Sequence, residues 1–549
     1  MHKGVRFIPL TRCITSSHNS KILSNKSFFQ TKSIVSISAA NRVHDTIFAL
    51  SSGPIVKTGV SVIRLSGKDS KVCLQKLCSP RAKFPDPRYA SLRKLYDPLN
   101  GELLDNALVL WFPGPGSFTG EDIVELHIHG SRAVILGIFK ALEDLDGVSI
   151  DEVNIEKKIR IRPADRGEFT RRAFDNGRLD LTEVEGLSDL LEAETSEQRK
   201  QALKQMEGYS RKKFEAWRDV LTKCLAHTEA VIDFGDDDRE EDVNDSAMWT
   251  LLPKIKLLKE ELMTHLTDGR KGEIIRDGLR IALAGPPNAG KSSLMNLMAR
   301  RPAAIVSPIA GTTRDIIEVR MDLAGVSCIL SDTAGLRVDS DDPIEMEGMR
   351  RAIKAFQEAQ IKVFVCDASN QLSLNNAEIM LQSIMSDVHM FDQDTSNVDE
   401  SYAFSKQNNR LLIAYNKADL SIKGENEYSL KKVENSNKML SMNVLSHRIS
   451  CTTSEGINEL EESIISSIKS ILATNTPDKG EGVLITRERH RGHLKQCVIH
   501  LDNFLSAKLP MDAAAEELRL ASRELCRITG TIDVEELLDI IFRDFCIGK

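Results

Sequence analysis

The chain of 549 residues lacks any apolar run as long as the roughly 18 uncharged residues that a membrane-spanning helix needs. Its ten cysteines include no pair in CxxC spacing, which argues against a zinc ribbon and gives no sign of a disulfide framework. Most of them are therefore expected to be reduced core residues. Because the chain is too long for a single hydrophobic core, about two to four domains and no membrane insertion are expected.

The first 44 residues lack carboxylates, although they hold many Ser and Thr and seven basic residues: Lys3, Arg6, Arg12, Lys21, Lys26, Lys32 and Arg42. This composition predicts a disordered mitochondrial transit peptide and hence a matrix protein; a disordered basic tail is the alternative. The whole chain has 73 Lys and Arg against 80 Asp and Glu, so the part after residue 44 is more acidic than the formal charge of −7. Any contact with RNA must therefore use a local basic surface.

The pattern of apolar residues changes several times along the chain and predicts a multi-domain α/β plus all-α fold. Residues 45–165 alternate short apolar runs with turns, as in an α+β domain. Helical periodicity in 166–275 and 476–549 predicts two halves of one helical domain, and alternation in 276–475 predicts a parallel sheet with crossover helices inserted between them. The helical stretches include Leu181 to Met206, Leu251 to Leu266, Ala513 to Thr529 and Val534 to Phe545, and a polar surface insertion is expected at about 370–410.

A phosphate-binding loop is predicted at Gly285 to Ser292, directly after the apolar run Arg280 to Ala284. In such a loop the backbone N–H groups surround the phosphates, Lys291 reaches the β and γ oxygens, and the Ser292 hydroxyl binds Mg²⁺. The strand before the loop and the helix after it supply the context that this motif requires. The nucleotide-contacting residues expected here are Asn288, Ala289, Gly290, Lys291, Ser292 and Ser293.

Two further segments are predicted to sense the γ-phosphate. The apolar run Val326 to Leu330 leads into Asp332, Thr333, Ala334 and Gly335, where the Asp is placed to hold the water shell of Mg²⁺ and the Gly to offer its N–H. The stretch 311–315 contains Thr312 and Thr313, and the Thr313 hydroxyl is expected to complete the magnesium coordination. Residues 311–315 are therefore predicted to form a switch loop.

A guanine-selecting segment follows the apolar run Leu411 to Tyr415. It reads Asn416, Lys417, Ala418, Asp419, and a carboxylate at this point accepts from both the ring N–H and the exocyclic amine of guanine, a donor pair that adenine lacks. Ser450 and Cys451 are expected in the loop that closes over the base. Together these segments, in this order, predict GTP binding and hydrolysis.

The residue that orients the attacking water is less evident. Leu336 stands where Ras-type proteins have a Gln, and an apolar side chain cannot polarise water. The carboxylates that follow Gly335 are the alternatives, although such charges more often belong to solvated loops: Asp339, Asp341, Asp342, Glu345 and Glu347.

With these residues the chain resembles the TrmE/MnmE family of tRNA-modification GTPases, in its mitochondrial branch. The resemblance extends from Asp45 to Lys549. The matching motifs are Ser117 to Asp122, His129-Gly130, Gly167-Glu168-Phe169, Arg172-Ala173-Phe174, Leu179-Asp180-Leu181, the Asn288 form of the phosphate loop and the terminal Cys546-Ile547-Gly548-Lys549.

The resemblance implies a folate-binding and dimerising N-terminal domain, a split helical domain and an inserted Ras-like G domain. It implies that a homodimer works with a flavin (FAD)-containing MnmG/GidA-like partner on mitochondrial tRNA, at C5 of the wobble uridine. It also implies that GTP-bound G domains pair in a potassium-dependent way, with K⁺ held by Asn288, Ser307, Ile309 and Thr312. A cation there offsets developing negative charge, as an arginine finger does in other GTPases.

The catalytic glutamate implied by the resemblance is Glu345, three residues before Gly348, with Glu347 as a second possibility. For a reduced folate, methylene- or formyl-tetrahydrofolate, it points to Arg64, Glu125, Arg178 and Lys549. Glu125 would accept from the pterin edge, whereas the cations suit the glutamate tail. Cys546 is expected to fill space near the chain end or to line this pocket.

Two other functions are compatible with a GTP site. A ribosome-assembly GTPase would need a basic RNA-binding module outside the G domain, and residues 45–270 show none. A regulatory switch without a metabolic substrate would bind neither folate nor tRNA.

Overall fold

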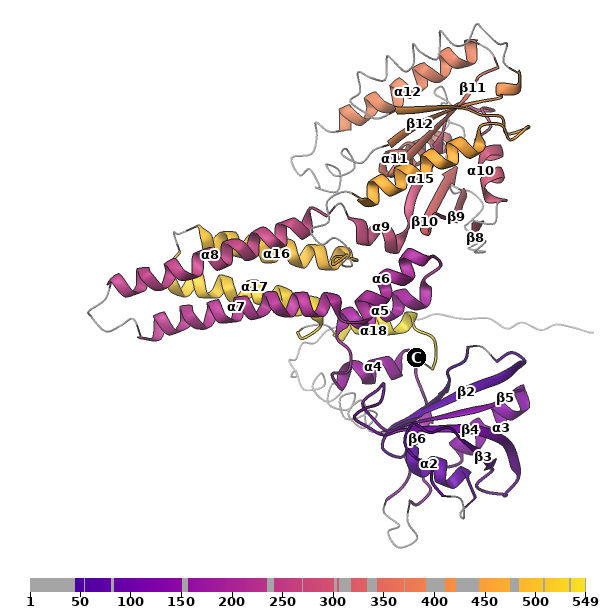
Figure 1. Cartoon of the computed structure of the whole chain (residues 1–549), viewed down its shortest axis with the longest axis vertical. Helices are drawn as coiled ribbons and strands as arrows, with labels where there is room; N and C mark the ends of the chain where they lie inside the picture. The colour runs from indigo at the N-terminus through magenta and orange to yellow at the C-terminus, as the bar shows by residue number, and fades with distance from the viewer. Residues whose placement is uncertain are drawn as a thin grey trace, which may run out of the picture. The chain divides into compact units, whose positions relative to one another are not determined.

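The computed structural model of the chain (Figure 1) describes residues 45–53, 55–79, 83–150, 157–234, 241–268, 270–300, 304–305, 317–332, 343–369, 371–391, 410–420, 444–473, 483–506, 509–532 and 535–548. The predicted leader lies outside them. The described residues form two compact units: one contains the chain up to Arg172 together with the last residues from Cys546, and the other is Ala173–Phe545. The division falls inside the helix α4 (Glu168–Asp175).

The first unit is built on a six-stranded sheet in the order β3-β4-β5-β2-β1-β6, with β1 and β6 parallel and the other pairs antiparallel. Its helices pack apolar side chains such as Leu74 and Ile138 into the same core as the sheet. The α+β class predicted for this part is confirmed. The strands are β1 (Thr46–Leu50), β2 (Thr58–Ser66), β3 (Ser91–Tyr96), β4 (Leu103–Phe112), β5 (Ile123–Gly130) and β6 (Ile161–Pro163), and the helices are α2 (Ser70–Leu77) and α3 (Arg132–Glu143).

The end of the chain packs into this first unit. Ile547 forms a β-bridge with Arg166, and Gly548 lies so close to β1 that an added Cβ would stand 2.3 Å from the Leu50 carbonyl oxygen. Gly548 also has φ of +97°, a conformation that glycine adopts without strain. Both facts explain why a glycine is needed there. Cys546 itself is exposed, so the expectation that it packs as apolar filling near the chain end is wrong, whereas its place in the wall of a folate pocket stays a prediction.

The second unit contains the helical domain, whose two halves come from either side of the inserted α/β block. Phe214, Trp217 and Leu262 of the first half share one buried core with Leu494 and Leu518 of the second, as predicted. The helices are α5 (Leu181–Glu192), α6 (Ser196–Met206), α7 (Tyr209–Phe234), α8 (Glu241–Leu266), α9 (Lys271–Asp277), α16 (Glu488–Leu505), α17 (Met511–Thr529) and α18 (Glu535–Asp544).

The continuous helix expected over Leu181 to Met206 is wrong, because the chain forms α5 and α6 instead. Thr195 has extended backbone and accepts a hydrogen bond from the Gln198 N–H, while the Gln198 side chain caps Thr195 in return. This capping box satisfies the free N–H groups of a new helix and starts it there.

The inserted block is a seven-stranded sheet in the order β13-β12-β11-β7-β10-β9-β8. Five strands are paired in parallel, as predicted, but β9 runs in the opposite direction and pairs antiparallel with both β10 and β8. The cause is the two-residue turn Ala324-Gly325, with φ of +56° and +86°, which joins β9 to β10 as a hairpin. The strands are β7 (Leu279–Ala284), β8 (Ala304–Ile305), β9 (Ile317–Leu323), β10 (Val326–Asp332), β11 (Ile361–Asp367), β12 (Arg410–Asn416) and β13 (Val444–Arg448).

Helices cover both faces of this sheet (Figure 1). They are α10 (Lys291–Ala299), α11 (Pro343–Glu358), α12 (Gln371–Phe391) and α15 (Ile457–Ala473), with the short 3-10 turn η1 (Ala418–Leu420). The helix α12 occupies the first half of the range in which an insertion was expected, and its buried Leu374 and Leu381 belong to the core. The remainder, 392–409, lies outside the described residues.

A group of buried and half-buried charged residues, which we call the neck, joins α5, α9 and the start of α16. Its centre is Glu185, only 1% exposed, which pairs with Arg489 at 2.9 Å and with His490 at 2.8 Å. Asp189 of the same helix pairs with Arg276 and Arg487: its distances to them are 3.1 and 2.7 Å. The neck thus ties together the helix before β7 and the segment that leads back into the helical domain.

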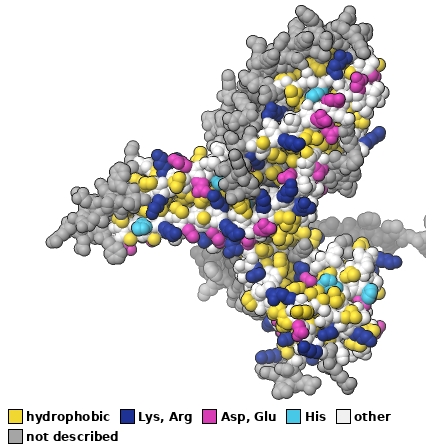
Figure 2. Space-filling view, viewed as in Figure 1, with side chains coloured by type: hydrophobic (Ala, Val, Ile, Leu, Met, Phe, Trp, Pro, Cys, Tyr) yellow, Lys and Arg dark blue, Asp and Glu magenta, His cyan; other side chains and the backbone are white. Residues whose placement is uncertain are grey.

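No helix of the described residues is long and apolar enough to cross a membrane. The nine described cysteines are free thiols, and five of them are buried. On the face drawn in Figure 2, Lys and Arg side chains alternate with Asp and Glu along the helical region. This face therefore presents mixed charge.

Candidate functional site

The predicted nucleotide-binding residues gather at one edge of the seven-stranded sheet. Because β7, β10, β11 and β12 run parallel, their carboxyl ends meet at this edge. Gly285 follows β7 and passes so close to β11 that an added Cβ would lie 2.1 Å from the Val365 carbonyl oxygen. Only glycine allows the loop to start at this point.

The loop after β7 ends at the first turn of α10. Asn288 and Gly290 have φ of +61° and +98°, which turn the backbone N–H groups of the loop inward. The Lys291 ammonium donates to the carbonyl oxygens of Gly285 and Pro286, both at 2.9 Å. Burial lowers the pKa of Lys291, and the negative charge of Asp332 partly opposes this shift. The arrangement places a cation in a ring of backbone groups suited to phosphate oxygens.

Ser292 and Asp332 meet beside this loop. The Ser292 hydroxyl donates to Asp332 Oδ2 at 2.6 Å, whereas Asp332 Oδ1 is buried without a hydrogen-bond partner among the described residues. A buried, unsatisfied carboxylate oxygen next to a hydroxyl is costly unless a cation or its water shell satisfies it. The pair therefore fits Mg²⁺, which prefers such oxygen ligands and retains several waters.

Asn416, the last residue of β12, links three motifs. Its Nδ2 donates to the Ala289 carbonyl at 2.8 Å, and its Oδ1 accepts from the Cys451 N–H at 3.1 Å. An added Cβ on Gly290 would stand 2.1 Å from Asn416 Nδ2, so glycine is also required there. The asparagine fixes the phosphate loop to the loop after β13.

Asp367 lies at the same edge of the sheet and was not predicted from the sequence. It ends β11 and its carboxylate pairs with Lys417 Nζ at 2.5 Å. Burial alone would raise the pKa of Asp367, but hydrogen bonds from Lys417 and Ser369 lower it below its ordinary value. The available signal was an Asp at the end of an apolar strand, the same signal that identified Asp332. The ion pair holds Lys417, which adopts φ of +64°, in one conformation.

The base-recognition residues lie just beyond Lys417. Asp419 is exposed in the turn η1, with its carboxylate accessible to a ligand. Ser450 is fully buried and its hydroxyl accepts from the Thr453 N–H at 3.1 Å, which shapes the loop that contains Cys451. Burial raises the pKa of the Cys451 thiol.

Several predicted site residues fall outside the described residues. They are Ser307, Ile309, Thr312, Thr313, Thr333, Ala334, Gly335 and Lys549. Glu345 belongs to α11, and its backbone alone is described. Ser293 stands in the first turn of α10.

In the first unit, Arg64 and Glu125 are direct neighbours on β2 and β5. Arg64 donates to Glu125 Oε1 through Nε at 3.0 Å and lies 2.9 Å from the same oxygen through its terminal nitrogen. His127 Nε2 lies 3.5 Å from the other carboxylate oxygen. The Arg64 guanidinium also lies 5.9 Å from the Phe118 ring. Arg178 is exposed and belongs to the second unit.

Two family descriptions match the chain: "GTP-binding protein TrmE N-terminus" over residues 46–178 and "MnmE helical domain" over residues 181–546. The mitochondrial 5-taurinomethyluridine-tRNA synthase subunit GTPB3 of Homo sapiens is 44% identical over 506 residues, 92% of this chain and 93% of that protein. The tRNA modification GTPase MnmE of Parvibaculum lavamentivorans is 42% identical over 508 residues, 92% and 100% of the two chains. The mitochondrial tRNA modification GTPase gtpbp3 of Dictyostelium discoideum is 41% identical over 520 residues, 92% and 96%.

Proposed function

The chain belongs to the TrmE/MnmE family of tRNA modification GTPases, and from this premise we propose that it hydrolyses GTP while modifying C5 of the wobble uridine in mitochondrial tRNAs. The observation that carries the proposal is the near-complete coverage of tRNA-modifying relatives at more than 40% identity. The proposed location is the mitochondrial matrix, since the N-terminal composition is that of a transit peptide and two of these relatives have "mitochondrial" in their names.

We infer that GTP binds at the carboxyl edge of the seven-stranded sheet. The support is the set of contacts among Lys291, Ser292, Asp332 and Asn416. Lys291 would exchange its two carbonyl partners for phosphate oxygens, and Ser292 with Thr313 would hold Mg²⁺, which neutralises phosphate charge when bound. Asp419 would accept from guanine.

For hydrolysis we propose that Glu345 orients the attacking water, because Leu336 has no polar group to do so. Asn288, Ser307, Ile309 and Thr312 would hold a potassium ion that offsets charge in the transition state. This set follows from the resemblance, and the positive φ of Asn288 is compatible with it.

For the modification we propose a homodimer that works with an FAD-containing partner and binds a reduced folate through Arg64, Glu125, Arg178 and Lys549. The structure of the first unit supports the folate site in two ways. The Arg64–Glu125 pair presents a fixed carboxylate for a pterin edge. The chain end also packs against Leu50 of β1, one residue from the register partner of Arg64, which is Ala49.

The deciding experiment is mass analysis of wobble uridines in mitochondrial tRNA from cells that lack this protein, re-supplied with the intact chain or with Glu345→Ala. We expect the C5 modification to vanish without the protein and to return with the intact chain. The Glu345→Ala chain should still bind GTP but lose most hydrolysis and leave the tRNA unmodified.

The outcome separates the competing functions. Normal tRNA together with no folate binding by the purified protein would reject the modification function and favour a regulatory switch. Normal tRNA with a ribosome-assembly defect would favour an assembly GTPase. Unchanged turnover of Glu345→Ala would remove that residue alone from the mechanism and direct attention to Glu347.

A further inference from the structure

Lys417 has a backbone conformation that a lysine rarely adopts. Its φ of +64° lies in the left-handed region, where the Cβ of any residue other than glycine comes too close to a neighbouring carbonyl oxygen. The residue stands between the end of β12 at Asn416 and the turn η1 that contains Asp419. The conformation of Lys417 therefore sets the direction in which the chain leaves the sheet, and with it the direction of the Asp419 carboxylate.

The end of the neighbouring strand β11 holds the Lys417 side chain. Asp367 is the register partner of Asn416, and its Oδ2 accepts a hydrogen bond from Lys417 Nζ at 2.5 Å. The other carboxylate oxygen of Asp367 accepts from the Ser369 N–H at 2.9 Å. Because both oxygens have donors, the carboxylate keeps one orientation and ties the lysine to β11.

The turn after Lys417 is fixed through its backbone. The Ala418 N–H donates to the Ile449 carbonyl at 3.1 Å, and the Leu420 N–H donates to the Lys417 carbonyl at 3.0 Å. Asp419 lies between these two anchored residues and is exposed. The direction of its carboxylate thus follows from backbone contacts that begin at Lys417.

The Asp367–Lys417 ion pair is expected to add little to folding. The two side chains are 18% and 33% exposed, so water screens their attraction, and ion pairs of this kind contribute little to stability. The left-handed conformation of Lys417 itself costs free energy. The main effect of the pair is therefore on the conformation of Lys417 and not on the stability of the sheet.

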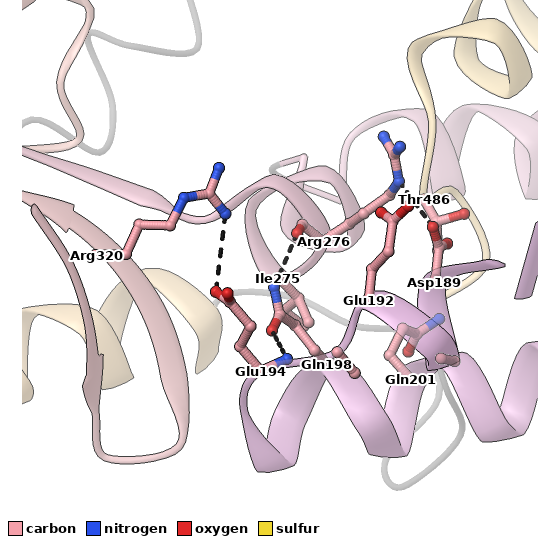
Figure 3. Close-up of a pocket in the computed structure, with 11 residues that line it drawn as sticks. Asp189, Glu192, Glu194, Gln198, Gln201, Ile275, Arg276, Arg320 and Thr486 are labelled. Atoms are coloured by element: carbon pink, nitrogen blue, oxygen red, sulfur yellow. Dashed lines mark hydrogen bonds and ion pairs between the residues drawn. The ribbon is translucent and has the colours of Figure 1, made fainter. Parts of the chain in front are cut away.

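A second carboxylate–cation pair in the same unit has similar exposure but a different place. Glu194 lies 3.9 Å from Arg320 of β9, and the two side chains are 31% and 38% exposed. Both line a polar cavity of about 340 Å³ whose wall also includes Arg276 (Figure 3). Neither residue belongs to the guanine-selecting segment, so Glu194 provides a matched control for the loss of a paired carboxylate.

We propose that Asp367 is a positioning residue for guanine recognition, because its carboxylate holds Lys417 in the left-handed conformation that directs Asp419 toward the base. This inference rests on the proposed binding of GTP. Without the carboxylate, Lys417 can leave the left-handed region, and Asp419 samples several directions that must be ordered again when the nucleotide binds. The loss therefore falls on the hydrogen bonds that Asp419 accepts from guanine.

The test compares two nucleotides that differ at a group bound by Asp419. The base of inosine diphosphate (IDP) keeps the ring N–H of guanine but lacks the exocyclic amine, so the ratio of the GDP and IDP affinities reports how well Asp419 is directed. Calorimetric titration of the full-length protein gives this ratio for the intact chain, Asp367→Asn and Asp367→Ala. Asp419→Ala marks the ratio without recognition of the amine, and Glu194→Gln is the control.

In Asp367→Ala we expect the GDP affinity to fall about tenfold and the GDP-to-IDP ratio about fivefold, the size of one weakened hydrogen bond. Asp367→Asn should change both less, because its amide oxygen can still accept from Lys417. Glu194→Gln should change neither. In the double variant Asp367→Ala/Asp419→Ala, the ratio should equal that of Asp419→Ala alone, because Asp367 acts through Asp419.

An unchanged ratio in Asp367→Ala, or a ratio in the double variant below that of Asp419→Ala, would overturn the proposal. Urea unfolding of the nucleotide-free proteins separates positioning from a structural role. Asp367→Ala should unfold at the same urea concentration as Glu194→Gln, and a lower midpoint would mean that Asp367 supports the sheet instead. If the intact protein binds neither nucleotide, the proposed GTP site itself fails, whereas normal GDP binding with an unchanged ratio in Asp367→Ala refutes only the positioning role.

Discussion

The nucleotide site and the neck are both polar and both within the second unit, yet they are built in opposite ways. At the nucleotide site, Gly285, Asp332 and Asn416 stand at or directly after the end of an apolar strand, and each belongs to a short motif. In the neck, Glu185 meets His490, which is 305 residues away in the sequence. The first region is encoded locally, whereas the second depends on the two helical halves having already come together.

This difference predicts different consequences of mutation. The nucleotide site is built to bind a ligand that comes from solution, so losing one of its side chains should weaken binding of that ligand without weakening folding. The neck holds charges that satisfy one another, so losing one partner should leave the others buried and unpaired.

The largest expected effect is that of Glu185→Gln in the neck. Replacing the carboxylate leaves His490, Arg489 and Arg487 without their shared negative partner, which costs about 3–5 kcal/mol of unfolding free energy. The affinity for GDP should not change. Urea unfolding at pH 7 measures the first quantity and calorimetric titration the second.

The matched control is Glu192→Gln, a carboxylate at the exposed end of the same helix. Its effect should stay within about 0.5 kcal/mol. A loss of less than about 1 kcal/mol in Glu185→Gln would mean that solvent screens the neck charges and that the contrast with the nucleotide site is false.

The next effect in size concerns Lys291→Ala at the nucleotide site. We expect GTP affinity to fall about 100-fold, near 2.7 kcal/mol, because a charge-assisted contact to phosphate is lost. Stability without nucleotide should be equal or slightly higher, since burial already lowers the pKa of this ammonium. Binding of a fluorescent GTP analogue and thermal unfolding of the empty protein check the two statements; a drop in stability matching that of Glu185→Gln would contradict them.

The smallest effect is in the pH dependence of stability. Burial raises the pKa of Glu185, but His490 and the two arginines outweigh it and hold the pKa far below the ordinary 4.5. The stabilisation of the folded state by the ionised Glu185 carboxylate is therefore fully present above about pH 4.5 and is lost as the pH falls further. Unfolding of the intact protein should lose up to about 1.4 kcal/mol per pH unit more than Glu185→Gln between pH 4.5 and 3. If the unfolding free energies of the intact protein and of Glu185→Gln fall in parallel with pH, Glu185 is not held ionised in the folded state.

The three-part fold could be predicted because the apolar residues of each part recur with the spacing of a strand or of a helix. The apolar strands before Gly285, Asp332 and Asn416 come directly before the motif residues, so strand and chemistry support each other. Asp367 was missed, although it also ends an apolar strand, because no motif drew attention to it. The break between α5 and α6 depends on one capping box, Thr195 with Gln198, inside a stretch that otherwise has continuous helical periodicity.

The antiparallel β9–β10 hairpin was missed for a similar reason. Ala324-Gly325 is a short turn signal between two apolar runs, but the predicted alternation of strands and helices favoured a crossover. The neck could not be predicted at all. A sequence shows Glu185 and His490 as ordinary polar residues, and their burial follows only from packing between distant helices.

The contacts of Ile547 with Arg166 and of Gly548 with Leu50 of β1 have a consequence for biosynthesis. A ribosome makes β1 long before it makes Gly548, so the first unit must wait for translation of the helical domain and the inserted block before these contacts can form. A bulky group attached next to Gly548 would therefore hinder the last step by which the first unit is assembled, because an added Cβ there already stands 2.3 Å from the Leu50 carbonyl oxygen.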